Sequence, residues 1–252
     1  IDLAYHSPLF LDLDGKKING WLQLLVIGDS AQGKSETCMT LQKHYGLGEK
    51  VECKNATVAG LLGGLQQLGT RWFVSWGVIP THDRRLVILE ELKGAPVEVI
   101  GRLTDMRSSG MAEIPKIERR RAHARTRLIA LSNPRGSRAV STYSFALSAI
   151  QELLGALEDV RRFDLALILQ AGEVSVEEMA GREVSQRFTG DLCRRLILWA
   201  WTSEVHFEQE ALDTLDERCK ALTSKFSEAM PLLDRGTARP KLARMAAGLA
   251  AR

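Results

Sequence analysis

Short apolar runs alternate with stretches of helical periodicity along the first two thirds of the chain. The runs cover residues 22–27, 86–89, 128–131 and 165–169. Each is uninterrupted and short, which is typical of a strand buried on both faces of a parallel sheet. Helical spacing occupies residues 35–44, 58–68, 97–107 and 144–159. This alternation predicts a doubly wound parallel α/β fold.

A different pattern begins near residue 173. In residues 192–201, 208–226 and 241–250, apolar side chains recur at i, i+3, i+4 and i+7, with no strand-like run between them. Such spacing predicts helices that bury one face. We therefore expect two units, an α/β core over residues 1–172 and a small all-helical domain over residues 173–252.

Residues 28–35 have the spacing of a phosphate-binding loop, because G-x-x-x-x-G-K-S here follows an apolar run and opens a helical pattern. In such a loop the backbone N–H groups and the helix N-terminus face the phosphates of a nucleotide. Lys34 is expected to reach the β- and γ-phosphates of ATP, and Ser35 to hold Mg²⁺. A glycine turn with a surface lysine is the plainer alternative, which the full motif disfavours. The residues expected to bind nucleotide are Gly28, Asp29, Ser30, Ala31, Gln32, Gly33, Lys34 and Ser35.

Polar residues also end the second and third apolar runs. Glu90 and Glu91 follow residues 86–89, and Asn133 follows residues 128–131. Beside a phosphate loop, Glu90 is expected to hold Mg²⁺ and Glu91 to polarise the attacking water. Asn133 could orient that water. Taken alone, a solvated acidic strand end explains Glu90 and Glu91 equally well, and an ordinary Asn-Pro turn explains Asn133 better.

Composition excludes few classes of protein. The chain has 252 residues, 45% hydrophobic and 26% charged, which is ordinary for a globular protein. It lacks the roughly 20-residue apolar stretch of a membrane span and has no basic leader. Because it does not begin with Met, we expect a piece of a longer protein. Four scattered cysteines without a C-x-x-C pair argue against a zinc site or disulfide framework and favour a cytoplasmic location.

Basic residues are concentrated in one window. Residues 116–138 contain eight lysines and arginines and one acid, a net charge of +7 against +3 for the whole chain. Such a window is a candidate for nucleic-acid phosphates. A solvated surface that contacts another subunit is the alternative.

Together these motifs resemble the ATPase domain of the minichromosome-maintenance (MCM) helicases, within the AAA+ class. The similarity covers nearly the whole chain from Gly20. It rests on residues 19–35, 57–61, 72–77, 124–134 and 162–165, the last reading R-F-D-L, and on the helical tail, which resembles the family's lid. Gly33 stands where the family usually has Ala, Glu90 stands where Asp is usual, and the helix-two insertion is short. We therefore expect a distant member, from a bacterium or a mobile element.

The resemblance implies a ring, usually a hexamer, with each ATP held between two subunits. Lys34, Glu91 and Asn133 would then act within their own subunit. Arg162 would be an arginine finger that reaches across the interface, and Arg239 the sensor-two arginine near the nucleotide.

The resemblance also implies a hairpin over residues 111–125 that grips DNA in the ring channel. Its candidate DNA-binding residues are Lys116, Arg119, Arg120 and Arg121. A second loop, residues 70–83, carries Trp72 and Trp76, which could stack on bases or simply pack the insertion.

The expected function is ATP hydrolysis coupled to translocation on single-stranded DNA and to duplex unwinding. One alternative is a ring ATPase that remodels protein complexes. Another is an ATP-dependent DNA-binding scaffold that unwinds little.

Overall fold

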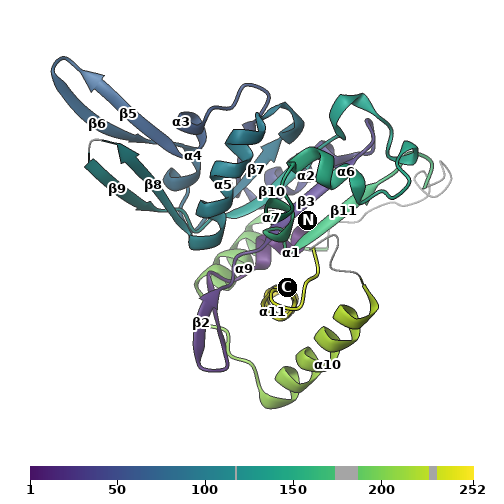
Figure 1. Cartoon of the computed structure of the whole chain (residues 1–252). Helices are drawn as coiled ribbons and strands as arrows, with labels where there is room; N and C mark the ends of the chain where they lie inside the picture. The colour runs from purple at the N-terminus through teal and green to yellow at the C-terminus, as the bar shows by residue number, and fades with distance from the viewer. Residues whose placement is uncertain (117, 174–186, 227–231) are drawn as a thin grey trace.

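The computed structural model describes residues 1–116, 118–173, 187–226 and 232–252 (Figure 1). Its centre is a parallel sheet of five strands in the order β11-β3-β10-β7-β4. The strands are β3 (Gln23–Gly28), β4 (Glu49–Glu52), β7 (Leu86–Glu90), β10 (Arg127–Ser132) and β11 (Leu165–Leu169). All four apolar runs of the sequence lie in this sheet, so the predicted parallel α/β layer is confirmed.

Helices cover both faces of the sheet. On one face lie α5 (Val97–Ser109), α6 (Ser148–Leu154) and α7 (Leu157–Arg161). On the other lie α1 (Asp2–His6), α2 (Lys34–Tyr45) and α9 (Gly190–Thr202). Residues of β3 alternate between the two cores, Leu25 and Ile27 in one and Leu24 and Val26 in the other. Burial on both faces explains why the strand is apolar throughout.

Strand β4 was not predicted from the sequence. Its residues are Glu49–Glu52, and all four side chains are at least partly exposed. It pairs only with β7, at the edge of the sheet. An edge strand buries little surface, so its polar sequence carries no strand signal.

Two predicted helices are wrong in part. Residues 58–68 form only a short helix α3 (Val58–Leu61), followed by strand β5 (Gly63–Leu68), which pairs with β6 (Arg71–Trp76). Gly63 begins the strand with a φ of +132°, a backbone conformation that residues with a side chain rarely adopt. Residues 144–159 are divided at Gly155, φ +84°, into α6 and α7.

Two hairpins project together from one end of the core, at the upper left of Figure 1. One is β5–β6. The other pairs β8 (Met111–Lys116) with β9 (Glu118–His123), where the sequence predicted a hairpin. The hairpins are in contact through β5 and β8. Helix α4 (Val78–Thr81) then leads from β6 to β7.

The tail is helical in its described part. Helices α10 (Gln209–Lys225) and α11 (Ala238–Ala250) pack on each other and on the hairpin of β1 (Phe10–Leu13) and β2 (Lys16–Asn19). Helix α9 packs on α1 and α2 and shares their core, and α11 also contacts α1. The division at residues 172–173 therefore stays a prediction. Among the described residues, no helix is long and apolar enough to cross a membrane.

Candidate nucleotide-binding site

The predicted phosphate loop joins the carboxyl end of β3 to the first turn of α2. Gly33 caps α2 in the left-handed region, with φ of +70°, and Ala31 has φ of +60°. Gly28 has a different reason to be glycine, because a Cβ there would lie 2.7 Å from the Cβ of Leu169 on β11. One glycine therefore shapes the turn, and the other admits the neighbouring strand.

Asp29 fastens the loop to two distant segments. Its buried carboxylate accepts hydrogen bonds from the backbone N–H of Val140, 2.7 Å from Oδ1, and of Ala171, 2.9 Å from Oδ2. These segments follow β10 and β11. Asp29 was predicted to bind nucleotide as part of the motif, but its side chain is engaged within the protein. Local sequence holds no signal for partners more than 100 residues away.

Lys34 is folded back over its own loop. Its Nζ donates to the carbonyl oxygens of Gly28 at 3.0 Å and Asp29 at 2.6 Å. Burial lowers the pKa of the ammonium group, while the charges of Glu91 and Asp29 oppose that shift. A phosphate group entering the loop would compete with the two carbonyls for this ammonium group.

Ser35 and Glu90, the two predicted magnesium ligands, lie close enough together for Ser35 to help lower the pKa of Glu90. Glu90 ends β7 and also pairs with Lys50 on β4. Burial raises the pKa of Glu90, but the bonds from Lys50 and Ser35 and the Lys50 charge outweigh it, so the pKa is lowered. The result is an ionised carboxylate beside a hydroxyl, both of them oxygen ligands that suit Mg²⁺.

A magnesium ion at this pair would need further ligands from phosphate and water, as is usual for Mg²⁺. In the part of the chain that the structure describes, no three His, Cys, Asp or Glu side chains converge to hold a metal. Lys50 was not predicted from the sequence. It lies on the unpredicted strand β4, and it competes with a metal for Glu90.

The backbone of Glu91 adopts a conformation that residues other than glycine seldom take. Its φ and ψ are 54° and 45°, in the left-handed region. Such strain in a residue other than glycine is common at functional sites. The side chain is 41% exposed and lies 3.5 Å from Lys93 Nζ. Its charge also raises the pKa of Lys34, which places the carboxylate near the loop.

Asn133 joins the same group. Its Nδ2 donates to Ser30 Oγ in the loop at 2.9 Å. The neighbouring Ser132 Oγ accepts from the Lys93 N–H at 3.0 Å and so links the ends of β7 and β10. The carboxyl ends of β3, β7 and β10 therefore bring Lys34, Glu90 and Asn133 to one edge of the sheet, where open α/β sheets bind ligands.

Arg162 lies at the opposite end of the strands, near the amino end of β3. It follows α7 and precedes β11, and the next residue but one, Asp164, donates its N–H to the Gln23 carbonyl at 2.9 Å. Gln23 begins β3, and the loop begins where β3 ends. The amino and carboxyl ends of β3 are separated by about 17 Å, at about 3.3 Å per residue. Arg162 therefore does not contact the phosphate loop of its own chain.

Arg239, on α11, is engaged with two carboxylates. It is bonded to Asp14, with Nη2 3.2 Å from Oδ1, and to Asp216. The bonds to Asp14 and then Asp216 raise the pKa of the guanidinium. No hydrogen bond or ion pair of the described residues joins Arg239 to the phosphate loop. The expected role of Arg239 beside a nucleotide stays a prediction.

The predicted DNA-binding arginines lie on the β8–β9 hairpin, where Arg119 and Arg121 form ion pairs with Glu113. Glu113 accepts from Arg119 and from Arg121 Nε, the latter at 2.9 Å. Arg120 alternates to the other face of β9, opposite Ile114. Lys116 belongs to β8, but its side chain lies outside the described part of the structure.

The aromatic residues of the other hairpin differ in exposure. Trp72 is 52% exposed on β6, whereas Trp76 packs against the core. The packing alternative therefore holds for Trp76. Phe73, next to Trp72, is also exposed.

Comparison with known proteins adds no family assignment, since the sequence matches no protein-family model and no curated protein. The resemblance to the MCM class therefore stays an inference from motifs.

Proposed function

We propose that this chain is the ATP-hydrolysing motor domain of a ring-shaped, MCM-like AAA+ DNA helicase. The observation that carries the proposal is the meeting of the motif side chains at one sheet edge. Lys34 lies over the loop, Ser35 is close enough to Glu90 to lower its pKa, and Asn133 is hydrogen-bonded to Ser30. Three separate sequence segments converge on the place where a phosphate loop would present a nucleotide.

The chemistry follows from these positions. Water attacks the γ-phosphorus of ATP, the bond to the β–γ bridging oxygen breaks, and the products are ADP and phosphate. Magnesium, held by Ser35 and Glu90, would neutralise charge on the β- and γ-phosphates. Lys34 stabilises the same charge, Glu91 accepts a proton from the water, and Asn133 orients it.

The position of Arg162 supports assembly into a ring, which the family resemblance implies is a hexamer. Arg162 and its own loop lie at opposite edges of the sheet. A finger so placed serves a nucleotide only if a second copy brings its loop to this edge. Hydrolysis would then require an interface between subunits.

The proposed ligand for translocation is single-stranded DNA, bound by the two projecting hairpins. Arg119, Arg120 and Arg121 carry positive charge there, and Trp72 offers an exposed ring for stacking. The Glu113 ion pairs favour the second candidate, a ring ATPase that remodels protein complexes, because they neutralise part of this charge.

The experiment compares ATP hydrolysis by wild type, Lys34→Ala and Lys43→Ala, with and without forked DNA. Lys43 is exposed on the same helix and serves as the matched control. We expect Lys34→Ala to lose hydrolysis by about 100-fold or more, as for removal of a transition-state donor, and Lys43→Ala to keep it.

Forked DNA should accelerate wild-type hydrolysis and be unwound. Wild-type rates in Lys34→Ala would overturn the proposed site. A rate of ATP hydrolysis that forked DNA does not change would favour the ring ATPase that remodels protein complexes. Stimulation of hydrolysis by DNA without unwinding would favour the ATP-dependent DNA-binding scaffold.

A further inference from the structure

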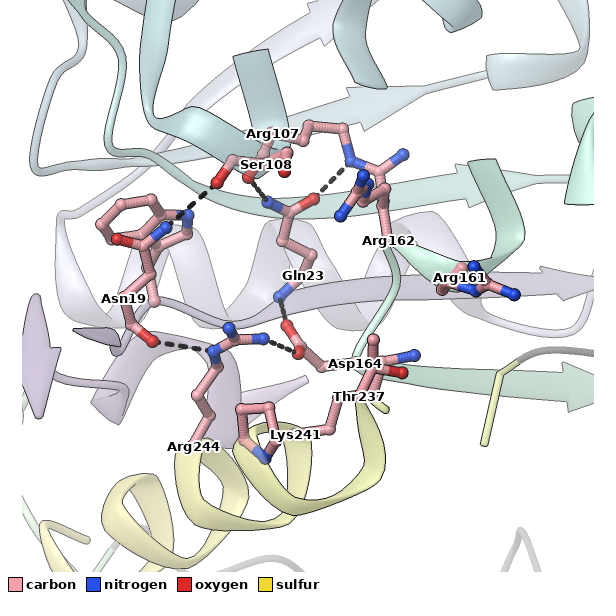
Figure 2. A pocket seen from close by; sticks show the side chains of 12 residues that line it. Asn19, Gln23, Arg107, Ser108, Arg161, Arg162, Asp164, Thr237, Lys241 and Arg244 are labelled. Carbon is pink, nitrogen blue, oxygen red and sulfur yellow. Dashed lines mark hydrogen bonds and ion pairs between the residues drawn. The ribbon is translucent and has the colours of Figure 1, made fainter. Parts of the chain in front are cut away.

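A small cavity whose lining includes five cations lies at the amino ends of β3 and β11, away from the phosphate loop (Figure 2). Its volume is about 180 Å³. Side chains from β3, α5, α11 and the segment joining α7 to β11 surround it. Among the described lining residues Asp164 is the one acid, and the cations are Arg107, Arg161, Arg162, Lys241 and Arg244.

Arg107, like Lys241, is more than nine-tenths buried. Its Nε donates to the Gln23 side chain, and its guanidinium stacks 3.8 Å from the centre of the Phe163 ring. Its Nη2 is buried and has no hydrogen-bond partner among the described residues. Burial lowers the pKa of Arg107 to about 10, so it remains charged at neutral pH. A buried charged donor without a partner is strongly unfavourable.

Arg162 adds a second guanidinium beside the first. Figure 2 draws the two groups next to each other, and the charge of Arg162 contributes to lowering the pKa of Arg107. In the described part of the chain, Arg162 makes no hydrogen bond or ion pair, and its side chain is exposed. Two like charges close to each other repel, and an anion between them would offset that repulsion.

The nearby carboxylates are already engaged. Asp164 accepts from Arg244 Nη1 at 2.6 Å and from the Gln23 N–H at 2.8 Å. Asp234 lies 3.3 Å from Arg161 Nε. The charge of Asp159 also acts on Arg107. Five cations therefore face three carboxylates, and positive charge remains in excess at this cavity.

Lys241 extends the positive charge to the side formed by α11. Its ammonium group donates to the Leu232 carbonyl at 2.7 Å, which leaves it without a bonded carboxylate among the described residues. It is buried, and burial lowers its pKa to about 8. An anion in the cavity would favour its charged form.

We propose that this cavity binds a phosphate group, with Arg107 and Arg162 as its principal donors and Lys241 adding charge. Paired guanidinium groups match the oxygens of a phosphate. The phosphate could be the terminal group of a nucleotide on a neighbouring copy, a source that rests on the proposed ring, or free inorganic phosphate. The family resemblance concerns Arg162 alone and assigns nothing to Arg107 or Lys241.

The test measures inorganic phosphate binding in Lys34→Ala protein, so that the phosphate loop contributes little. Calorimetry and thermal melting are recorded with phosphate and with chloride at equal ionic strength. We expect saturable binding that raises the melting temperature. Adding Arg107→Met should weaken it at least tenfold, whereas adding Arg195→Ala, at an exposed cation on α9, should not.

Arg162→Ala is the second variant, because an exposed side chain can be removed without disturbing the core. It should also weaken phosphate binding. Absence of saturable binding in Lys34→Ala protein would overturn the proposal. So would unchanged affinity when Arg107 or Arg162 is removed from correctly folded protein, as judged by circular dichroism.

Hydrolysis assays distinguish the two sources. If the cavity receives a neighbour's nucleotide, Arg107→Met should slow ATP hydrolysis in a pure ring, and mixing with Lys34→Ala subunits should restore part of it. Full hydrolysis in Arg107→Met, with phosphate binding lost, would assign the site to free phosphate. A wild-type protein without ATPase activity would remove the proposed function and leave the phosphate measurement intact.

Discussion

The proposed chemistry at the candidate site depends on single residues, and Glu91 has the most specific predicted role, that of the general base. It sits in the left-handed region, next to the strand-ending Glu90, and faces solvent near Lys34. We predict that Glu91→Gln binds ATP and magnesium normally yet hydrolyses ATP about 10²- to 10⁴-fold more slowly, the range for loss of a general base. Nucleotide binding and single-turnover hydrolysis, measured separately, check this.

Glu90→Gln is the matched comparison. Because the Glu90 carboxylate lies beside Ser35, loss of this carboxylate should raise the magnesium concentration needed for hydrolysis. If Glu91→Gln changed the magnesium requirement and Glu90→Gln abolished turnover, the two roles would have to be exchanged.

The predictability of the site also differs residue by residue. Lys34, Ser35 and Glu90 lie together because a motif fixes their place relative to strand ends, which local sequence reveals. The partners of Asp29 and the Lys50 ion pair depend on contacts between segments far apart in sequence. No spacing rule applies to such contacts, so sequence reasoning missed them.

Among the elements, the hairpins show where periodicity misleads. Apolar residues in 58–68 fit a helical period, but the second half forms β5 and pairs with β6. Helix and strand patterns overlap over such short segments, and cross-strand pairing decided the outcome. The β8–β9 hairpin was predicted by resemblance instead, and its ion pairs were not foreseen.

Glu113 is the element-scale prediction for DNA binding. Its ion pairs with Arg119 and Arg121 must be broken or shared when phosphates approach. We predict that Glu113→Gln binds single-stranded DNA about two- to fivefold more tightly, as expected for release of exposed pairs, and with a steeper salt dependence. Fluorescence anisotropy at several salt concentrations measures both.

Glu210→Gln, an exposed change on α10, controls for the loss of one negative charge. Equal or weaker binding by Glu113→Gln, relative to wild type, would argue that the hairpin does not carry DNA.

Helix α11 supplies a prediction about pH. Burial lowers the pKa of Lys241 from 10.5 to about 8. Between these values the unfolded chain binds more protons than the folded one, so the free energy of unfolding rises with pH across that window. The gain due to Lys241 is on the order of 3 kcal/mol at most, from about 1.4 kcal/mol per pKa unit.

Urea denaturation of wild type and Lys241→Met, in phosphate-free buffer from pH 7 to 10, measures this gain. As the pH rises, the free energy of unfolding of wild type should increase relative to that of Lys241→Met. Lys43→Met, at an exposed lysine, should show no such shift relative to wild type. A constant difference for Lys241→Met would mean that the buried ammonium group has an ordinary pKa.

At the scale of the whole molecule, the parallel sheet could be predicted and the placement of the tail could not. Buried parallel strands are apolar on both faces, so they are visible in sequence. An amphipathic stripe predicts a buried face but not its partner. Accordingly α9 packs on α1 and α2, while α10 and α11 pack on the β1–β2 hairpin, and neither arrangement was predicted.

The sheet also separates Arg162 from the phosphate loop, and this separation can be tested in mixed rings. Arg162→Ala and Lys34→Ala subunits should each form inactive rings, since one lacks the finger and the other the loop lysine. Removing a finger typically lowers hydrolysis by 10³- to 10⁵-fold. Nucleotide binding by isolated Arg162→Ala subunits should stay near wild type, because Arg162 is remote from its own loop.

Mixing the two variants restores sound interfaces only if the finger acts between subunits. In a randomly assembled equal mixture, about one interface in four pairs an intact loop with an intact finger. Hydrolysis should therefore recover to at most about a quarter of the wild-type rate, and a titration of one variant into the other should give a maximum between the pure proteins. An inactive mixture, despite co-assembly shown by native mass spectrometry, would remove the trans role of Arg162. Full activity of pure Arg162→Ala would make it an ordinary surface charge, and the opposite sheet edge would then have no part in hydrolysis.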